Sequence, residues 1–325
     1  MTLDTEALDT YIRSEVAKNR FSGAVLVAQG RDTVFKQAYG LANKRYDVPN
    51  RVDTKFNLGS INKIFTKVAI TQMIEKGRLG YDDLVGKFLP DLPSEIAQKV
   101  TVHHLLTHTS GLGHYWNERF QASIGNLRTV GDFVRLFIDD PLSFEPGERM
   151  QYSNAGYVVL GKIVEVLAGQ CYYDYVRENI YEPAGMTDSD HYELDDPVPN
   201  LAIGYTRGEG APQPLETRTE NTFLIGTKGS PAGGGYSTLN DMLGFDIALE
   251  ENKLLGPECS LSILRPPDAN EDSRPSVVAL AGGAPGLAAF FVKYYQAGYT
   301  TVILSNYDPP DAEPVEKKIR EMIGE

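Results

Sequence analysis

The sequence is poor in cysteine and has no long apolar run. Its 325 residues include two cysteines, Cys171 and Cys259, too few for a disulfide framework or a cysteine metal cluster, so we treat them as free thiols. No stretch approaches the roughly 18 continuous apolar residues of a membrane span. Residues 1–18 are acidic and amphipathic, without the basic and apolar parts of a secretory signal. If nothing precedes them, we expect a cytoplasmic protein.

Basic residues are also in deficit. The chain has 31 Lys and Arg against 44 Asp and Glu, which gives a net charge of −13. This charge argues against nucleic acid and anionic membrane surfaces as partners, and it repels anionic substrates unless a local cation attracts them. A hydrophobic fraction of 42% and a charged fraction of 23% are typical of a globular protein with a sizeable core.

Strand patterns lie near both ends of the chain, with helical patterns between them. The predicted helices span residues 2–19, 60–76, 154–168, 237–250 and 311–323, with a short capped one over 101–112 that stops at Gly111; the predicted strands form a hairpin over 23–41 and lie at 201–205, 276–281, 287–293 and 299–304. Together they predict an α+β fold. An antiparallel β-sheet flanked by helices would come from residues 1–58 and 201–325, and an inserted all-α region from 59–200. We expect the active site in the cleft between them, beside a polar loop at 207–230.

Ser60 and Lys63 stand three residues apart at the start of an apolar, helix-forming run. A serine at the start of a helix commonly caps it. However, burying a lysine is costly unless its charge is used or paired. A desolvated lysine one turn away can take the serine proton and turn the hydroxyl into a nucleophile. No G-x-S-x-G elbow occurs, so an α/β-hydrolase is not the candidate.

A tyrosine-x-asparagine pattern occurs at 115–117 and again at Tyr152 and Asn154, where a loop meets a predicted helix. A nearby lysine cation would lower the pKa of the Tyr152 phenol, which would then share in proton transfer. The Asn154 amide can bond both Lys63 and a substrate carbonyl.

These motifs, in this order, resemble the serine β-lactamase and penicillin-binding-protein superfamily, especially its class C-like β-lactamases, DD-peptidases and esterases. The resemblance runs from about residue 20 to residue 305 and rests on SINK at 60–63, TVHHLLTHTSGL at 101–112, YSN at 152–154, EPAGM at 182–186 and GSPAGGGYSTLNDM at 229–242. It implies an α/β sandwich with an all-α region, and neither metal nor cofactor. It also implies that Ser60 is the acylated nucleophile, Lys63 its activator, and Tyr152 the general base and then acid. Asn154 would orient Lys63 and the substrate.

The third motif departs from that superfamily. Its members carry K-T-G or H-x-G on a strand lining the cleft, and here Leu280, Ala281 and Gly282 align with those positions. The usual cation meets a carboxylate, whereas leucine offers no charge-assisted bond. Gly283 should still supply the second oxyanion N–H beside that of Ser60, because a backbone donor does not depend on the missing side chain.

We therefore predict a serine hydrolase, foremost a carboxylesterase acting on small neutral esters, whose partner is a small-molecule ester or amide. Trp116, Tyr115 and Phe120 would line its acyl or alcohol side, or else pack in the core. One alternative is a β-lactamase or D-amino-acid peptidase, which requires a replacement cation such as Lys228 or Arg274. Another, of a different class, is a non-catalytic binding or sensor protein on the same fold.

Two further patterns carry less weight. His104 and His108 stand at i and i+4, as in a zinc helix, but the glutamate of H-E-x-x-H and a third ligand are missing. The glycines after Pro231 suggest a phosphate loop, but no G-K-[ST] follows. We interpret the first as a structural helix and the second as a tight turn beside the cleft.

Overall fold

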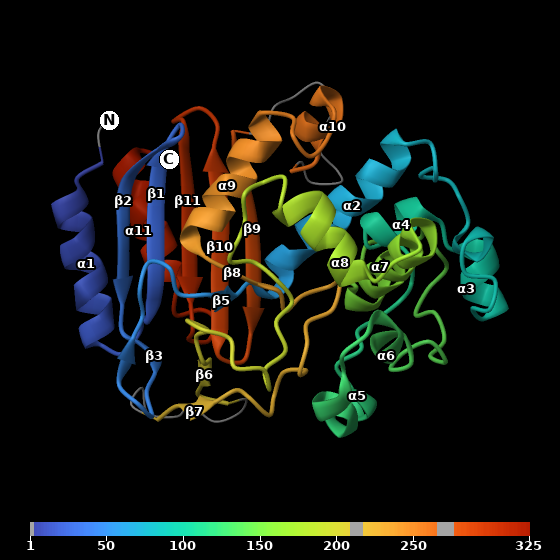
Figure 1. Ribbon diagram of the computed structural model, residues 1–325, viewed down its shortest axis with the longest axis horizontal. Coiled ribbons are helices and arrows are strands. Elements are labelled where there is room, and N and C mark those ends of the chain that lie inside the picture. Colours follow the sequence, from blue (N-terminus) through green and yellow to red (C-terminus); the bar gives the residue numbers. More distant parts are fainter. Residues whose placement is uncertain (1–2, 209–216, 265–275) are drawn as a thin grey trace.

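The computed structural model describes residues 3–208, 217–264 and 276–325, and an antiparallel sheet lies at its centre (Figure 1). Its strands are β1 (Gly23–Gln29), β2 (Asp32–Tyr39), β9 (Val277–Ala284), β10 (Leu287–Tyr294) and β11 (Tyr299–Ser305). They are hydrogen-bonded in the order β2-β1-β11-β10-β9, so that the first and last parts of the chain share one sheet. This arrangement confirms the predicted fold class.

Helices cover both faces of the sheet, which explains why every residue of β11 is buried. Neighbouring residues of β1 face opposite sides, as strand geometry requires. Val25 lies in the core with α1 (Thr5–Ala17) and α11 (Glu313–Ile323), whereas Leu26 lies in the core with α9 (Leu239–Glu250). Figure 1 shows α9 in front of the sheet and α11 behind it.

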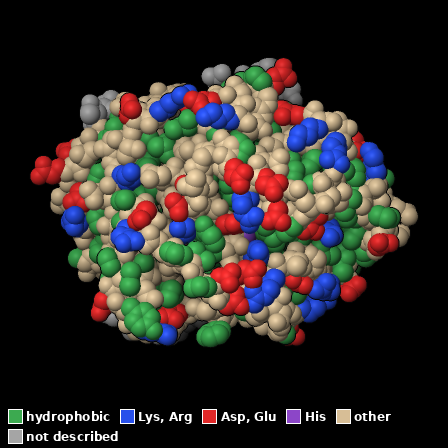
Figure 2. Space-filling view, viewed as in Figure 1, with side chains coloured by type: hydrophobic (Ala, Val, Ile, Leu, Met, Phe, Trp, Pro, Cys, Tyr) green, Lys and Arg blue, Asp and Glu red, His purple; other side chains and the backbone are tan. Residues whose placement is uncertain are grey.

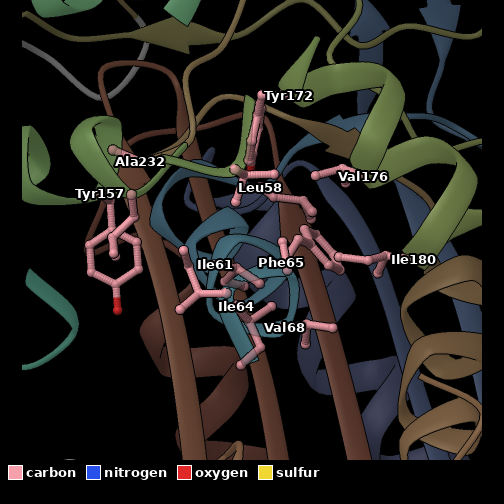
Figure 3. Packing of buried hydrophobic residues seen from close by; sticks show 14 of the residues in the cluster. Leu58, Ile61, Ile64, Phe65, Val68, Tyr157, Tyr172, Val176, Ile180 and Ala232 are labelled. Atoms are coloured by element: carbon pink, nitrogen blue, oxygen red, sulfur yellow. The ribbon is translucent and has the colours of Figure 1, made fainter. Parts of the chain in front are cut away.

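The segment between the two parts of the sheet is mainly helical. Its longest helices, α2 (Lys63–Glu75) and α7 (Asn154–Ala168), pack against each other. The shorter helical segments are η1 (Gly59–Asn62), η2 (Val85–Lys87), α3 (Ser94–Lys99), α4 (Val102–Leu106), α5 (Glu118–Ser123), η3 (Ile124–Asn126), α6 (Val130–Val134), α8 (Tyr172–Val176) and η4 (Arg177–Tyr181). Figure 3 shows Phe65 and Val68 of α2 inside this core. Because α2 is enclosed on nearly all sides, Lys63 at its start is buried as well, with 7% of its surface exposed.

Short strands hold the chain in place just before residue 60. The strand β5 (Phe56–Asn57) pairs antiparallel with β8 (Tyr236–Ser237), and the Leu58 N–H donates to the Gly235 carbonyl at 2.8 Å. The remaining elements are β3 (Leu41–Asn43), β4 (Val48–Pro49), β6 (Tyr205–Thr206), β7 (Thr219–Glu220) and α10 (Pro257–Ser262). The β5–β8 pairing ties η1 to the turn at 230–235.

Most predicted elements are present within one to three residues of their expected bounds, but two are wrong. The helix predicted over 101–112 ends at Leu106 rather than before Gly111. The backbone of His108 adopts a left-handed conformation, with φ 59°, which no helix continues. The strand predicted over 201–205 reduces to a bridge between Leu201 and Lys55 and to β6, because this stretch pairs with loops rather than with the sheet.

The polar segment at 207–230 was expected beside the cleft. Its residues 209–216 lie outside the described part, and residues 225–230 line a hollow next to Ser60. Acidic and basic side chains are interspersed on the face that Figure 2 shows. Among the helices of the described ranges, none has the length and apolar character needed to cross a membrane.

Candidate active site

Ser60 lies in the 3₁₀ turn η1, directly before α2. Gly59 before it has φ 52°, and its N–H donates to Asn57 Oδ1 at 2.9 Å, so the turn is fixed on the side of β5. Throughout η1 and α2, which are fully described, no side-chain cap bond involves Ser60. Its hydroxyl contacts Lys63 and Tyr152 instead, which is the relation expected of a nucleophile rather than of a helix cap.

Lys63 approaches three oxygen atoms. Its Nζ lies 2.7 Å from Asn154 Oδ1, 2.5 Å from the Ala232 carbonyl oxygen and 3.2 Å from Ser60 Oγ. Burial lowers the pKa of Lys63 from 10.5 to about 7. A neutral amine would donate its two hydrogens to Asn154 and Ala232, and its lone pair would then face the serine hydroxyl.

Tyr152 reaches the same serine oxygen, since its hydroxyl donates to Ser60 Oγ at 2.7 Å. The expected lowering of its pKa is wrong: burial raises the pKa of Tyr152, against a smaller lowering by its bond to Ser60. The physical reason is burial of the phenol, and Lys63 is not among the groups that lower this pKa. Its Nζ lies 4.8 Å from the centre of the tyrosine ring, over its face.

Asn154 is the first residue of α7, which Ser153 caps by accepting a bond from the Gly156 N–H at 2.9 Å. This cap fixes where the Asn154 side chain leaves the helix. Its Oδ1 accepts from Lys63, and its Nδ2 lies 3.2 Å from Nδ1 of His114. The structure therefore brings Ser60, Lys63, Tyr152 and Asn154 into one cluster of hydrogen bonds.

Neither of two histidines at this cluster was predicted from the sequence as part of it, and His108 was considered only as a zinc ligand. The His108 ring stacks on the Tyr152 ring, with centroids 4.7 Å apart, and its Nδ1 accepts from the Ser153 N–H at 3.2 Å. Burial lowers the pKa of His108 from 6.5 to about 4, so this ring is neutral at neutral pH. The His114 ring is tilted against the Tyr152 ring, with centroids 5.9 Å apart. The only sequence signal was that both histidines belong to one short segment with glycines between them, THTSGLGH at 107–114.

The backbone of the edge strand β9 packs directly against the backbone of η1, without side chains between them. A Cβ placed on Gly282 would lie 2.0 Å from the Leu58 carbonyl oxygen and 3.0 Å from the Ser60 nitrogen. A Cβ placed on Gly59 would lie 2.9 Å from the Gly283 nitrogen. The backbones of β9 and η1 thus cross so closely that only glycine fits at positions 59 and 282. The amides of Ser60 and Gly283 border this crossing.

Two hollows meet at Ser60. The first hollow encloses about 650 Å³, including its open mouth, and its wall contains Asn154, Gly283, Tyr115, Trp116, Phe120, Phe133, Leu194, Ile225 and Lys228. The second hollow encloses about 930 Å³, measured in the same way, and its wall contains Lys63, Tyr152, His108, Leu280 and Ala281. Leu280 is partly buried and Ala281 is exposed. Lys63 and Tyr152 therefore line a different hollow from Gly283, and Ser60 lines both.

The aromatic residues of the first hollow divide by exposure. Tyr115 is buried, and its hydroxyl bonds Ser230 Oγ at 2.9 Å, which makes it part of the floor. Trp116 is 43% exposed and stacks on Phe120, with ring centres 5.5 Å apart and planes 5° apart. Trp116 thus forms an apolar rim, supported from below by the buried Phe120.

Lys228, one of the two predicted replacement cations, does lie in the wall of the first hollow. Its Nζ pairs with Glu193 Oε1 at 3.1 Å and lies 4.5 Å from the centre of the Tyr173 ring. Arg128 contacts the same carboxylate and also pairs with Asp195, so the two cations face two carboxylates. The charge of Lys228 is thus already matched by a protein carboxylate, and Arg274 lies outside the described residues.

Both histidines of the zinc-like pair, His104 and His108, accept hydrogen bonds from backbone N–H groups. His104 Nδ1 accepts from the Thr101 N–H in a capping box, and His108 is bonded to Ser153. Within the described ranges, no group of three or more His, Cys, Asp or Glu side chains converges as a metal would require. The turn after Pro231 supplies the Ala232 carbonyl that holds Lys63.

Comparison with known proteins identifies the family of this chain. The family model described as Beta-lactamase matches residues 8–322, and the chain belongs to that family. It is 31% identical to a penicillin-binding protein of Bacillus subtilis, over 92% of this chain and 71% of that protein, and 33% identical to the esterase EstB of Burkholderia gladioli, over 77% and 71%. The structure of a penicillin-binding protein from Bacillus halodurans superposes with a TM-score of 0.85 at 28% identity, covering 96% of this chain and 99% of that one. The protein is a serine hydrolase of the β-lactamase superfamily.

Proposed function

We propose that the protein is a carboxylesterase that cleaves small neutral esters through an acyl-enzyme on Ser60. One observation carries this proposal: a single oxygen, Ser60 Oγ, is within hydrogen-bonding distance of both Lys63 Nζ and the Tyr152 hydroxyl, at 3.2 and 2.7 Å. A serine hydroxyl needs such a base to become a nucleophile.

Lys63 is the base of the first step in this proposal. A pKa of about 7 leaves a large fraction of the amine neutral at neutral pH, whereas the raised pKa of Tyr152 keeps its phenol protonated. Ser60 Oγ attacks the ester carbonyl while its proton passes to Lys63. The amides of Ser60 and Gly283 border the backbone crossing and would stabilise the oxyanion.

Tyr152 is the acid of the second step. Its proton passes to the departing alkoxide, and the ammonium formed on Lys63 then reprotonates the phenolate. The alcohol therefore leaves with the proton of Tyr152, and the proton that Ser60 gave up ends on Tyr152. Water then attacks the acyl-enzyme, activated by the same pair, and releases the carboxylic acid and free Ser60. The reaction needs no added oxidant, metal or cofactor for its atoms and charges to balance.

The two hollows suggest where each part of the ester lies. Lys63 and Tyr152 border only the second hollow, so the alcohol that receives their proton leaves on that side. The acyl group would occupy the first hollow, against Tyr115 and Trp116. Both sides favour uncharged groups, because Leu280 replaces the usual cation and Glu193 neutralises Lys228.

A panel of p-nitrophenyl esters with acyl chains of increasing length tests the proposal. Wild-type protein should hydrolyse the short neutral esters, and Ser60→Ala should lose at least a thousandfold in kcat/KM, since the nucleophile is absent. Ser143→Ala, a change at an exposed serine outside the site, is the matched control and should keep full activity. Equal activity of Ser60→Ala and wild type would refute the mechanism.

The similarity to penicillin-binding proteins favours one second candidate, hydrolysis of β-lactams or D-amino-acid peptides. Nitrocefin turnover in parallel separates it from esterase activity. Should neither substrate react and no fluorophosphonate adduct form on Ser60, the non-catalytic binding role would replace both.

A further inference from the structure

The carboxamide of Asn154 is held from both ends. Its Oδ1 lies 2.7 Å from Lys63 Nζ, and its Nδ2 lies 3.2 Å from Nδ1 of His114. Lys63 brings only N–H groups to this contact, whether it is charged or uses its lone pair for Ser60. The amide must therefore turn its oxygen to the lysine, and its NH₂ group then faces the histidine.

His114 can meet that NH₂ group only as an acceptor. This requires a neutral imidazole with an unprotonated Nδ1 and the hydrogen on Nε2. The second hydrogen of the Asn154 NH₂ group stays available for a bond to substrate, because Asn154 also lines the first hollow. His114 is exposed to solvent, so its protonation state follows the medium.

We propose that His114 is a positioning residue, which fixes the carboxamide of Asn154 so that its oxygen keeps the Lys63 amine directed at Ser60, and which releases that hold when the imidazole is protonated. The inference rests on the proposed role of Lys63 as the base. Protonation would put an Nδ1–H donor against the amide NH₂ donor, and the amide would have to turn or move away. Lys63 would then lose its acceptor.

The groups around His114 favour its neutral form. Partial burial of the ring, and then the nearby Lys63, lower the pKa of His114 below its usual 6.5. The groups that face it are Lys63 from α2, Tyr152 from the loop before α7, and His108, whose pKa His114 lowers in turn. No carboxylate is among the groups that act on the imidazole in the described residues. At neutral pH the acceptor state is thus the resting state.

The test measures how fast a fluorophosphonate labels Ser60 between pH 5 and 8, by intact mass, on wild type, His114→Ala, His114→Gln and the matched control His103→Gln. His103 is an exposed histidine of α4 outside the cluster. We expect His114→Ala to label about tenfold more slowly at pH 8, and His114→Gln, whose amide oxygen accepts without titrating, to stay within about twofold of wild type. His103→Gln should match wild type throughout.

The pH dependence separates positioning from a structural role. In wild type, the rate should fall tenfold per pH unit below the pKa of Lys63 and by up to about a further tenfold as His114 becomes protonated, whereas His114→Gln should lack this further fall. Superimposed profiles of wild type and His114→Gln across the His114 pKa measured by NMR would overturn the proposal. So would an NMR spectrum that shows the Nδ1–H tautomer at pH 8. Because labelling and tautomer do not depend on any ester being a substrate, a failed ester panel leaves this test intact.

Discussion

The imidazole of His108 lies against the phenol ring of Tyr152, with centroids 4.7 Å apart and planes inclined by 30°. The histidine is itself fixed, because its Nδ1 accepts a bond from the Ser153 N–H, one residue beyond the tyrosine. Tyr152 is 40% exposed and would otherwise have room to swing out of the site. The stack therefore holds the phenol hydroxyl 2.7 Å from Ser60 Oγ.

The first prediction concerns this stack. His108→Asn should lower kcat on p-nitrophenyl acetate by about tenfold with a smaller change in KM, because the phenol loses its support while the first hollow, proposed for the acyl group, is untouched. Asparagine tolerates the left-handed backbone found at His108, so the melting temperature should change little. His108→Phe, which keeps the stack, should retain more activity than His108→Asn. The reverse order of the two variants would contradict the proposed support.

The second prediction is the pH profile of the wild type. If neutral Lys63 is the base, kcat/KM for a neutral ester should rise with pH through a midpoint near 7, since the pKa of Lys63 is lowered to about 7. Initial rates in buffers of constant ionic strength measure the midpoint. A profile that rises only above pH 10 would instead assign the first proton transfer to the Tyr152 phenolate, because burial raises the pKa of Tyr152 above its ordinary value.

The third prediction links the same lysine to stability. Between pH 7 and 10.5 the unfolded chain binds a proton at Lys63 that the folded protein releases, so this group makes the folded state more stable as pH rises. Relative to Lys63→Met, the wild type should gain up to about 1.4 kcal/mol of unfolding free energy per pH unit over this window. Urea unfolding of both proteins at pH 7, 8 and 9 gives the difference. A difference that stays constant with pH would show that the lysine is charged in the folded protein.

Much of this site could be predicted from the sequence because its residues occur as two close pairs along the chain. Ser60 and Lys63 are one turn apart, and Tyr152 and Asn154 flank the start of a strongly apolar helix. Such short-range patterns carry the periodicity of helices and their caps.

What the sequence could not supply are contacts between distant segments. The residues around Lys228 in the sequence do not indicate that it forms an ion pair with Glu193, which lies 35 positions earlier. The left-handed backbone of His108 was not predicted either, nor were the contacts of its ring with Tyr152 and Ser153, which lie more than 40 positions away. The direction of the Tyr152 pKa was wrong for a similar reason: it depends on burial, which follows from tertiary packing.

The fourth prediction concerns the crossing of β9 and η1. Gly282→Ala would place a Cβ 2.0 Å from the Leu58 carbonyl oxygen, so the strand or the turn must move. We expect a loss of roughly 1–3 kcal/mol in unfolding free energy, together with a loss of kcat, because the Ser60 amide lies 3.0 Å from the same Cβ. Gly298→Ala is a control with open space around its Cβ, although its φ of 70° gives it a strain of its own. Thermal and urea unfolding measure both, and full activity of Gly282→Ala would argue against an oxyanion site at this crossing.

The fifth prediction restores the missing cation. Leu280 shares the second hollow with Lys63 and Ser60, so Leu280→Lys would place an ammonium where the alcohol side of the substrate lies. A charge-assisted bond is worth about 1.5–3 kcal/mol, so the ratio of kcat/KM for a carboxylate-bearing ester to that for its neutral analogue should rise at least about tenfold. The added positive charge also disfavours protonation of Lys63, which should move the midpoint of the pH profile to a lower pH. Leu280→Met keeps the apolar character and should change neither quantity. An unchanged ratio and an unchanged midpoint in Leu280→Lys would show that this position does not face the substrate, and the preference for neutral esters would need another cause.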